Sequence, residues 1–215
     1  MKKDIMVLVF GATGKTGRII VKKLLKEGYS VKAFVRNIEK VNHIVHENFF
    51  VSQGDVRNAK AVEDAVKDSD IVVSALGNLR VFRNTIISDG VANIIGAMKL
   101  QGKNRLVFMS SLGVGDSKWQ LGLIYNFIYL PTFLHNVFKD KERQEKIIHE
   151  SGLAWTIIRP AGFLPIPLPF RYRVCVMPSR PRILPIMSRF HTADFIVKEC
   201  GNNQYIQKNV ALSYF

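Results

Sequence analysis

Residues 5–17 read IMVLVF-GATGKTG: six apolar residues and, directly after them, a turn that holds three glycines. A continuous apolar run of this length is typical of a buried parallel strand. Glycines let the backbone approach a pyrophosphate closely, and the N-terminus of a following helix attracts the phosphate charge. The next residues predict such a helix, which ends at Gly28. The stretch therefore predicts a strand–turn–helix unit that binds a dinucleotide.

The same letters allow two other interpretations. An ordinary tight turn also uses glycines, and Gly14-Lys15-Thr16 resembles the end of a P-loop. A P-loop needs another glycine five residues before Gly14, and this chain has Val9 there. The glycine spacing is G-x-x-G-x-x-G, so we favour the dinucleotide site.

The size and composition of the chain are typical of one globular domain. We expect a single domain over residues 1–215, because this length buries a substantial core. The chain is 47% hydrophobic and 22% charged, as in ordinary soluble proteins. Its two cysteines, Cys175 and Cys200, form neither a disulfide framework nor a metal-binding spacing, which favours a cytoplasmic location. The densest apolar stretch, residues 121–134, is too short to span a bilayer.

The net charge of +14 is unusual and favours contact with anions. Lysines and arginines are scattered along the chain, so we interpret them as a solvated surface and expect no nucleic-acid partner. A peripheral membrane contact stays open, and the sequence does not predict the oligomeric state. His43 and His46 have no other ligands near them in sequence, so we expect a surface pair and no metal site.

Short apolar runs alternate with amphipathic segments through the first 160 residues. The strand-like runs are residues 5–10, 31–35, 49–51, 71–76, 106–109 and 155–158. The helix-like segments are residues 16–27, 59–67, 89–101 and 137–150. This alternation predicts an α/β fold: a doubly wound Rossmann-type parallel sheet with helices on both faces. Ligands of such sheets bind at the carboxyl ends of the strands, so site residues should follow each strand.

The sequence changes character after Arg159-Pro160. Residues 163–187 are rich in proline and lack a clear periodicity, which opposes both a helix and a central strand. We interpret them as a small segment on the substrate side of the same domain. A last helix over residues 192–200 and a strand near 210–213 are predicted to return the chain to the sheet.

Arg36 follows the second predicted strand. An acidic residue here would hold the ribose hydroxyls of NAD, whereas a guanidinium suits the 2′-phosphate of NADP. Lys15 adds a second positive charge to the same neighbourhood. The alternative is a merely solvent-exposed arginine at a strand end. We expect NADP, with NADPH preferred over NADH.

The next two strands are followed by short or small side chains. Asp55 is placed to accept a hydrogen bond from an adenine amino group while Val56 packs on the ring, or else Asp55 begins a turn or caps the next helix. Ala75, Leu76 and Gly77 leave room for a cofactor ribose.

Ser110 and Ser111 follow the fifth strand, where a hydroxyl polarises an acceptor beside a nicotinamide or caps the backbone. Lys141 is predicted to lie on a helix and to bind the nicotinamide ribose, with a solvated charged face as the competing interpretation. The aromatic-rich residues 119–138 are predicted to pack in the core or to cover the substrate.

Together these residues resemble the atypical short-chain dehydrogenase/reductase family, in its branch of NAD(P)H-binding flavin reductase-like (biliverdin reductase B-like) and NmrA-like proteins. The resemblance covers almost the whole chain, from the glycine turn to the segment Ser151-Gly152-Leu153-x-Trp155-Thr156-Ile157-Ile158-Arg159-Pro160. The cofactor-binding residues that it implies are Gly11, Ala12, Thr13, Gly14, Lys15, Thr16, Gly17, Arg36, Asp55, Val56, Ala75, Leu76, Gly77, Ser110, Lys141 and Pro160. The catalytic residues that it implies are Ser111 and Lys141.

Two positions depart from the family pattern. The usual catalytic pair is a tyrosine and, four residues later, a lysine; Lys141 matches the lysine, but Val137 stands in the tyrosine's place. Flavin reductase-like relatives dispense with that tyrosine, and their serine after the fifth strand matches Ser111. Their histidine after the sixth strand is not matched, because Ala161 follows Pro160.

The resemblance implies an NADPH-dependent oxidoreductase that transfers a hydride to a planar acceptor such as a flavin or a quinone. Holding donor and acceptor in the right orientation would supply most of the rate. The alternative is a non-catalytic NADP(H)-binding redox sensor of NmrA-like type, in which the missing tyrosine means that no turnover occurs.

Overall fold

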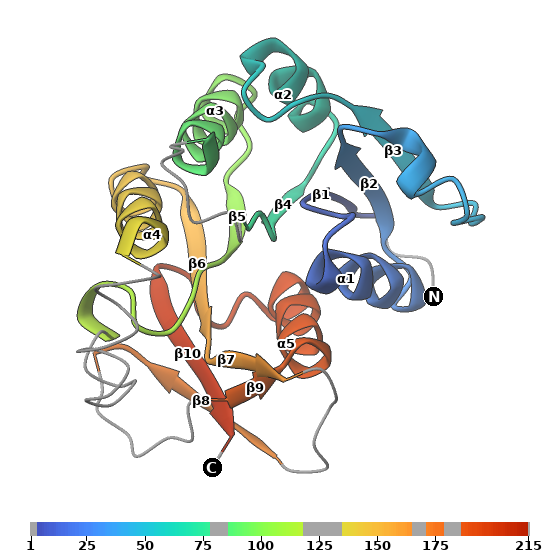
Figure 1. Cartoon of the computed structure of the whole chain (residues 1–215). Coiled ribbons are helices and arrows are strands. Elements are labelled where there is room, and N and C mark those ends of the chain that lie inside the picture. The colour runs from blue at the N-terminus through green and yellow to red at the C-terminus, as the bar shows by residue number, and fades with distance from the viewer. Residues whose placement is uncertain (1–3, 78–85, 118–134, 165–170, 179–185, 215) are drawn as a thin grey trace.

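An eight-stranded sheet forms the centre of the molecule (Figure 1). The computed structural model describes residues 4–77, 86–117, 135–164, 171–178 and 186–214. The strand order is β3-β2-β1-β4-β5-β6-β10-β8. The strands are β1 Met6–Phe10, β2 Ser30–Val35, β3 Phe49–Gln53, β4 Ile71–Ser74, β5 Arg105–Met109, β6 Ala154–Pro160, β8 Tyr172–Val176 and β10 Lys208–Tyr214. The order reverses between β1 and β4, which is where a sheet of this type binds its ligand.

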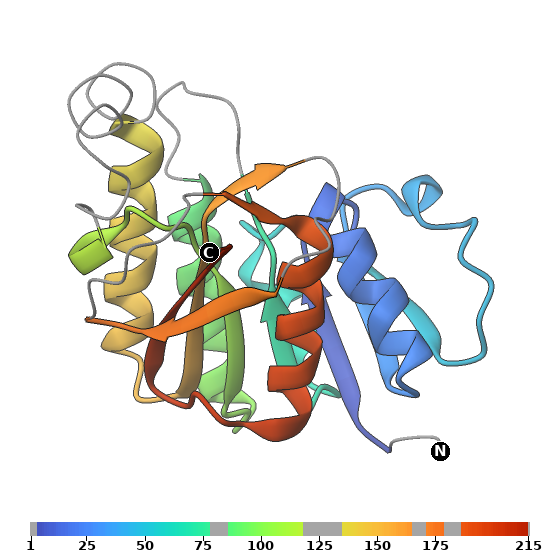
Figure 2. The same ribbon diagram turned by 90° about the horizontal axis from the view of Figure 1, so that it is seen from below.

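All neighbouring strands are parallel except β8, which runs antiparallel to β10 at the sheet's edge. Parallel pairing requires a crossover between consecutive strands, and helices cover both faces of the sheet (Figures 1 and 2). Helices α1 Lys15–Lys26 and α5 Arg189–Asn202 lie on one face. Helices α2 Ala59–Val66, α3 Ile86–Leu100 and α4 His135–His149 lie on the other. The predicted doubly wound fold is confirmed.

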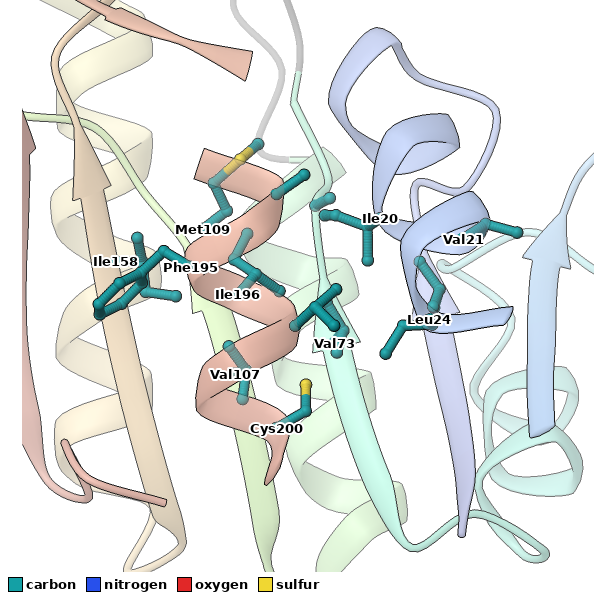
Figure 3. Close-up of a cluster of buried hydrophobic side chains, with 14 of the residues drawn as sticks. Ile20, Val21, Leu24, Val73, Val107, Met109, Ile158, Phe195, Ile196 and Cys200 are labelled. Carbon is teal, nitrogen blue, oxygen red and sulfur yellow. The ribbon is translucent and has the colours of Figure 1, made fainter. Parts of the chain in front are cut away.

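Two hydrophobic clusters, one on each face, hold the layers together. On the α1 and α5 face, Ile20 and Leu24 of α1 and Ile196 of α5 pack over Val73 and Val107 of the sheet (Figure 3). All five are fully buried. Each such aliphatic side chain contributes about 1.5–3 kcal/mol of transfer free energy. The strand ends that carry the site are therefore fixed from both faces.

Several strand ends differ from the sequence prediction by one or two residues; β6, for example, runs from Ala154 to Pro160 rather than from 155 to 158. β3 continues to Gln53, two residues beyond the apolar run, because an edge strand tolerates polar residues that face water. β4 ends at Ser74 rather than at residue 76. The backbone N–H of Ala75 still bonds to the carbonyl of Phe10 at 2.9 Å, after which Leu76 and Gly77 leave the sheet.

The proline-rich segment contains short strands that the sequence did not indicate. β7 Gly162–Leu164 pairs with β9 Ile186–Ser188 in a separate two-stranded sheet, and β8 borders the main sheet. The described part of this segment holds neither a helix nor a central strand. Residues 165–170 and 179–185, and the predicted aromatic cover at residues 119–134, lie outside the described residues.

Candidate functional site

The glycine turn after β1 meets the end of β4 at the point where the strand order reverses. Gly11 has a φ of +78°, and a Cβ there would lie 2.6 Å from the carbonyl oxygen of Ala75. At Gly17 a Cβ would lie 2.1 Å from the carbonyl oxygen of Gly11. Real Cβ atoms do not approach backbone this closely, so both positions require glycine. The packing of β1, β4 and α1 fixes the shape of the turn.

The N-terminus of α1 is arranged to receive an anion. Its N-cap is Gly14, whose N–H bonds to the Gly11 carbonyl at 3.0 Å. No side chain caps the helix, and its first turn has no acidic residue. A Cβ at Gly14 would meet only the Gly11 oxygen, at 3.2 Å, so a side chain there would occupy open space in front of the helix. Uncapped N–H groups, the positive helix dipole and an open approach fit a pyrophosphate.

The other residues of the turn support this arrangement. Ala12 and Thr16 are buried, Thr13 is half-buried and Lys15 is exposed. Ala12 and Thr16 therefore fix the turn against the sheet, and Lys15 places a cation near the anion site. The structure brings all of these predicted residues together, next to Ala75, Leu76 and Gly77 after β4.

Arg36 comes directly after β2 and is exposed. Its side chain forms no ion pair with any residue that the structure describes. It lies close enough to Asp55, after the neighbouring strand β3, to lower the pKa of that carboxyl. A free guanidinium at the end of β2 is available to a phosphate.

Asp55 forms an ion pair that the sequence analysis missed. Its carboxylate accepts from Arg57 Nε at 3.0 Å and from Arg57 Nη2 at 2.8 Å, and Oδ1 also accepts the backbone N–H of Arg57 at 2.9 Å. Chiefly through these bonds, the pKa of Asp55 falls to about 2. Asp55 thus begins a turn, as one of the two interpretations held, but α2 is capped by Asn58, whose Oδ1 accepts from Ala61 N at 3.1 Å. The spacing Asp-x-Arg was the available signal.

Val56 is held against α3. Its carbonyl accepts from Asn93 Nδ2 at 2.9 Å, and its side chain fills the space beside Gly90, where a Cβ would lie 2.7 Å from both Val56 methyl groups. The side chain is half-buried. Val56 is thus fixed in the loop after β3, as its predicted role beside an adenine requires.

The two serines after β5 differ in their surroundings. Ser111 is half-buried, and its Oγ donates to the Leu112 carbonyl at 3.3 Å. Ser110 is buried, and its Oγ finds no hydrogen-bond partner among the described atoms; the same is true of Ser74 Oγ at the end of neighbouring β4. An unpaired buried hydroxyl costs free energy, so a polar group at this edge of the sheet would relieve that cost.

Lys141 lies on α4, as predicted, and is half-buried. Burial lowers the pKa of its ammonium, and the charges of Glu145 and Asp140 act against that shift. Val137, one turn earlier on α4, is half-buried and offers no proton. Lys141 is thus a half-buried cation on α4, without the family's usual acid one turn before it.

A buried ionic cluster joins α4 to β6 below this edge. Arg159 is 1% exposed, and its guanidinium donates to both Glu145 oxygens, at 3.1 Å and 2.6 Å, and to Asp116. Burial opposes the charge of Arg159, but hydrogen bonds and charges of Glu145 and Asp116 outweigh it and raise its pKa. Pro160 and Ala161 follow and are buried. The cluster fixes α4, and with it Lys141, relative to the sheet.

A cavity of about 460 Å³ borders this cluster and extends towards His149 and Asn209. None of the cofactor residues predicted from the sequence lines it. Among the described residues, no group of three or more His, Cys, Asp and Glu side chains is arranged to hold a metal. No helix in the described part of the chain has the length and apolarity needed to cross a membrane.

Comparisons with known proteins agree with this geometry. The family described as NAD(P)H-binding matches residues 11–203. An uncharacterized chloroplastic protein from Arabidopsis thaliana is 34% identical over 170 residues, which cover 73% of this chain and 58% of that protein. The chain thus spans little more than half of that relative's length.

Solved structures show the same fold. A Rossmann-fold NAD(P)-binding family protein from Shigella flexneri superimposes with a TM-score of 0.77 at 25% identity, over 99% of this chain and 94% of that one. ChuY, an anaerobillin reductase from Escherichia coli O157:H7, has a TM-score of 0.80 at 21% identity, over 97% and 96% of the two chains. The chain therefore belongs to the NAD(P)H-binding family, whose members include proteins with the Rossmann fold.

Proposed function

We propose that this protein is an NADPH-dependent oxidoreductase that transfers a hydride to a planar acceptor such as a flavin or a quinone. The observation that carries the proposal is the open, uncapped N-terminus of α1 behind a turn that only glycine can form. This N-terminus lies where the strand order reverses, and the exposed cation Arg36 directly follows the neighbouring strand β2. The fold shared with a reductase, ChuY, supports the same class of activity.

When bound, NADPH would supply the hydride. The backbone from Gly11 to Gly17 would hold its pyrophosphate, and Arg36 and Lys15 its 2′-phosphate. Asp55, Val56, Ala75, Leu76 and Gly77 would line the adenosine and ribose. These roles follow from the position of each residue after its strand.

The chain's own residues would orient the acceptor rather than protonate it. Lys141 would bind the nicotinamide ribose, and the hydroxyl of Ser111 would polarise the acceptor, with Ser110 and Pro160 shaping the edge behind them. Val137 cannot act as a general acid. Reduction of a flavin or quinone makes little demand on a protein acid, because the acceptor takes its proton from water.

Val137 also favours a second candidate: a non-catalytic NADP(H)-binding redox sensor. In that case the turn after β1 would bind the cofactor, and the residues after β5 and on α4 would catalyse no hydride transfer. The cytoplasmic location, the absence of a nucleic-acid partner and the interpretation of the charged surface stay predictions.

One assay separates these candidates: NADPH oxidation followed by nicotinamide absorbance with a flavin, a quinone and an aldehyde as acceptors. We expect oxidation with flavin or quinone and none with aldehyde. Saturable NADPH binding without oxidation by any acceptor would favour the sensor. Reduction of the aldehyde alone would contradict a planar acceptor.

A further inference from the structure

The loop after β3 carries a guanidinium that is fixed in place but still open to solvent. Arg57 is held by two side-chain bonds and one backbone bond to Asp55, yet its side chain is 59% exposed. The two bonded donors are Nε–H and one N–H of Nη2, so three of the five guanidinium N–H groups are not used by Asp55. A side chain fixed this way loses little entropy when it binds a further anion.

The loop that carries this pair is itself rigid. Gly54 N–H donates to the Val35 carbonyl at 3.0 Å and Asn58 N–H to the Asp55 carbonyl at 2.9 Å. Asn93 of α3 holds the Val56 carbonyl at 2.9 Å. A Cβ at Gly54 would lie 2.6 Å from the Phe34 ring, so the backbone is also packed tightly against β2. Arg57 is therefore held on Asp55 in a loop whose backbone is fixed against β2 and α3.

The charges at this position determine which nucleotide can bind. Arg36 and Arg57 both act on the Asp55 carboxylate, whose pKa of about 2 keeps it ionised at neutral pH. A 2′-phosphate next to Arg36 would be repelled by this carboxylate if the carboxylate were unpaired. When Arg57 pairs with Asp55, their two charges cancel. Arg36 then gives this position a net charge of +1.

We propose that Arg57 is a specificity-determining residue for the 2′-phosphorylated nucleotide, because its two side-chain bonds neutralise Asp55 and leave three of its own N–H groups for a further anion. This inference rests on the proposed NADP site. It changes the role of Asp55, which positions Arg57 as well as lining the adenosine. Without Arg57 the unpaired Asp55 carboxylate would offset the positive charge of Arg36, which disfavours the 2′-phosphate.

The test is a binding titration with adenosine 2′,5′-bisphosphate and with AMP, which differ only in the 2′-phosphate. Arg57→Ala should weaken the bisphosphate roughly tenfold and leave AMP within about twofold, because one close charge pair across a partly exposed site is lost. The double variant Asp55→Asn/Arg57→Ala should recover most of the bisphosphate affinity, because the unpaired carboxylate is gone.

Lys60→Ala is the matched control. It removes one cation, 72% exposed, from the first turn of α2, where it pairs with Asp64 at 2.9 Å. It should leave both affinities unchanged. Equal weakening of bisphosphate and AMP by Arg57→Ala, or an equal effect of Lys60→Ala, would overturn the inference.

These outcomes are independent of turnover. If the wild-type protein prefers the bisphosphate and Arg57→Ala removes the preference, the inference holds even when no acceptor is reduced and the proposed activity fails. If acceptors are reduced but Arg57→Ala keeps the full preference, the activity stands and the inference fails.

Discussion

The proposed nucleotide side of the site, at the turn after β1, and its proposed acceptor side, after β5 and along α4, are built in different ways. The turn after β1 is defined by backbone that packs on backbone, with a hypothetical Cβ at Gly17 only 2.1 Å from a carbonyl oxygen. The acceptor side, after β5 and along α4, is defined by buried polar side chains: Ser110 without a described partner, Lys141 with a lowered pKa and Arg159 in an ion pair. Few substitutions are compatible with backbone that packs on backbone, whereas many different substitutions can alter a network of side chains. A family can therefore keep its cofactor and alter its acceptor.

The largest effect is expected from Gly17→Ala. The added methyl group would overlap the Gly11 carbonyl, so the turn must open. Losing one hydrogen bond to the charged pyrophosphate costs about 1.5–3 kcal/mol, which is up to about 100-fold in NADPH affinity. Gly96→Ala is the control, since nothing lies within 4 Å of a Cβ there and alanine favours a helix. Calorimetric titration measures both variants. Wild-type affinity in Gly17→Ala would mean that packing does not define the turn.

On the acceptor side, Arg159→Met should lower the free energy of unfolding by about 3–5 kcal/mol, because Glu145 is left buried and unpaired. Urea denaturation measures the loss. Lys146→Met is the control: its contact with Glu150 is exposed and 3.9 Å long, so a change below about 1 kcal/mol is expected. Similar losses in both variants would show that the cluster does not stabilise α4.

Ser111→Ala should slow turnover by about 10²-fold and leave NADPH binding nearly unchanged, because the hydroxyl is assigned to the acceptor. Steady-state rates at saturating NADPH test this. A rate equal to wild type would show that Ser111 has only a structural role, through its hydrogen bond to the Leu112 carbonyl.

Arg36→Glu should reverse the nucleotide preference by roughly tenfold in favour of NADH, since a carboxylate repels the 2′-phosphate and accepts from ribose hydroxyls. The ratio of the two dissociation constants is the measurement. A ratio equal to that of the wild-type protein would show that Arg36 does not bind the 2′-phosphate.

The smallest effect concerns Lys141→Met. Burial lowers the pKa of Lys141, so the folded state holds its proton less tightly than the unfolded state. Stability of the wild-type protein therefore rises with pH once pH passes the lowered pKa, until the ordinary pKa of 10.5 is reached. The variant has no such cost. It should therefore be more stable than the wild-type protein near neutral pH, with a smaller difference near pH 10, as urea denaturation at several pH values would measure; a pH-independent difference would contradict this.

The sequence predicted the strand–turn–helix unit at residues 5–26 because the backbone of its turn is rigid and requires particular residues. Gly11 and Gly17 can be recognised in the sequence because the backbone at these two positions requires glycine. The apolar strands identified the sheet, and their alternation with helices identified its topology. The edge residues Ser52 and Gln53 were missed because an edge strand need not be apolar.

The acceptor side was predicted less completely because its contacts join distant residues. Arg159 and Glu145 are fourteen positions apart, on different elements. Asp116, in the loop after β5, gave no local signal. Arg57 was missed for another reason: its contact with Asp55 is short in sequence, but an exposed arginine at a strand end looks like any surface residue until the ion pair is seen.

The central claim is that the open space before α1 at Gly14 receives the cofactor's pyrophosphate. Titration of NADPH into wild-type protein and Gly14→Ala tests it most directly, because the backbone at Gly14, with φ −71° and ψ 163°, accepts alanine. We predict that the variant folds with a melting temperature within about 5 °C of wild type, because a Cβ 3.2 Å from the Gly11 oxygen needs only a small shift. It should lose at least about tenfold in NADPH affinity. Equal affinity in the two folded proteins would contradict the claim.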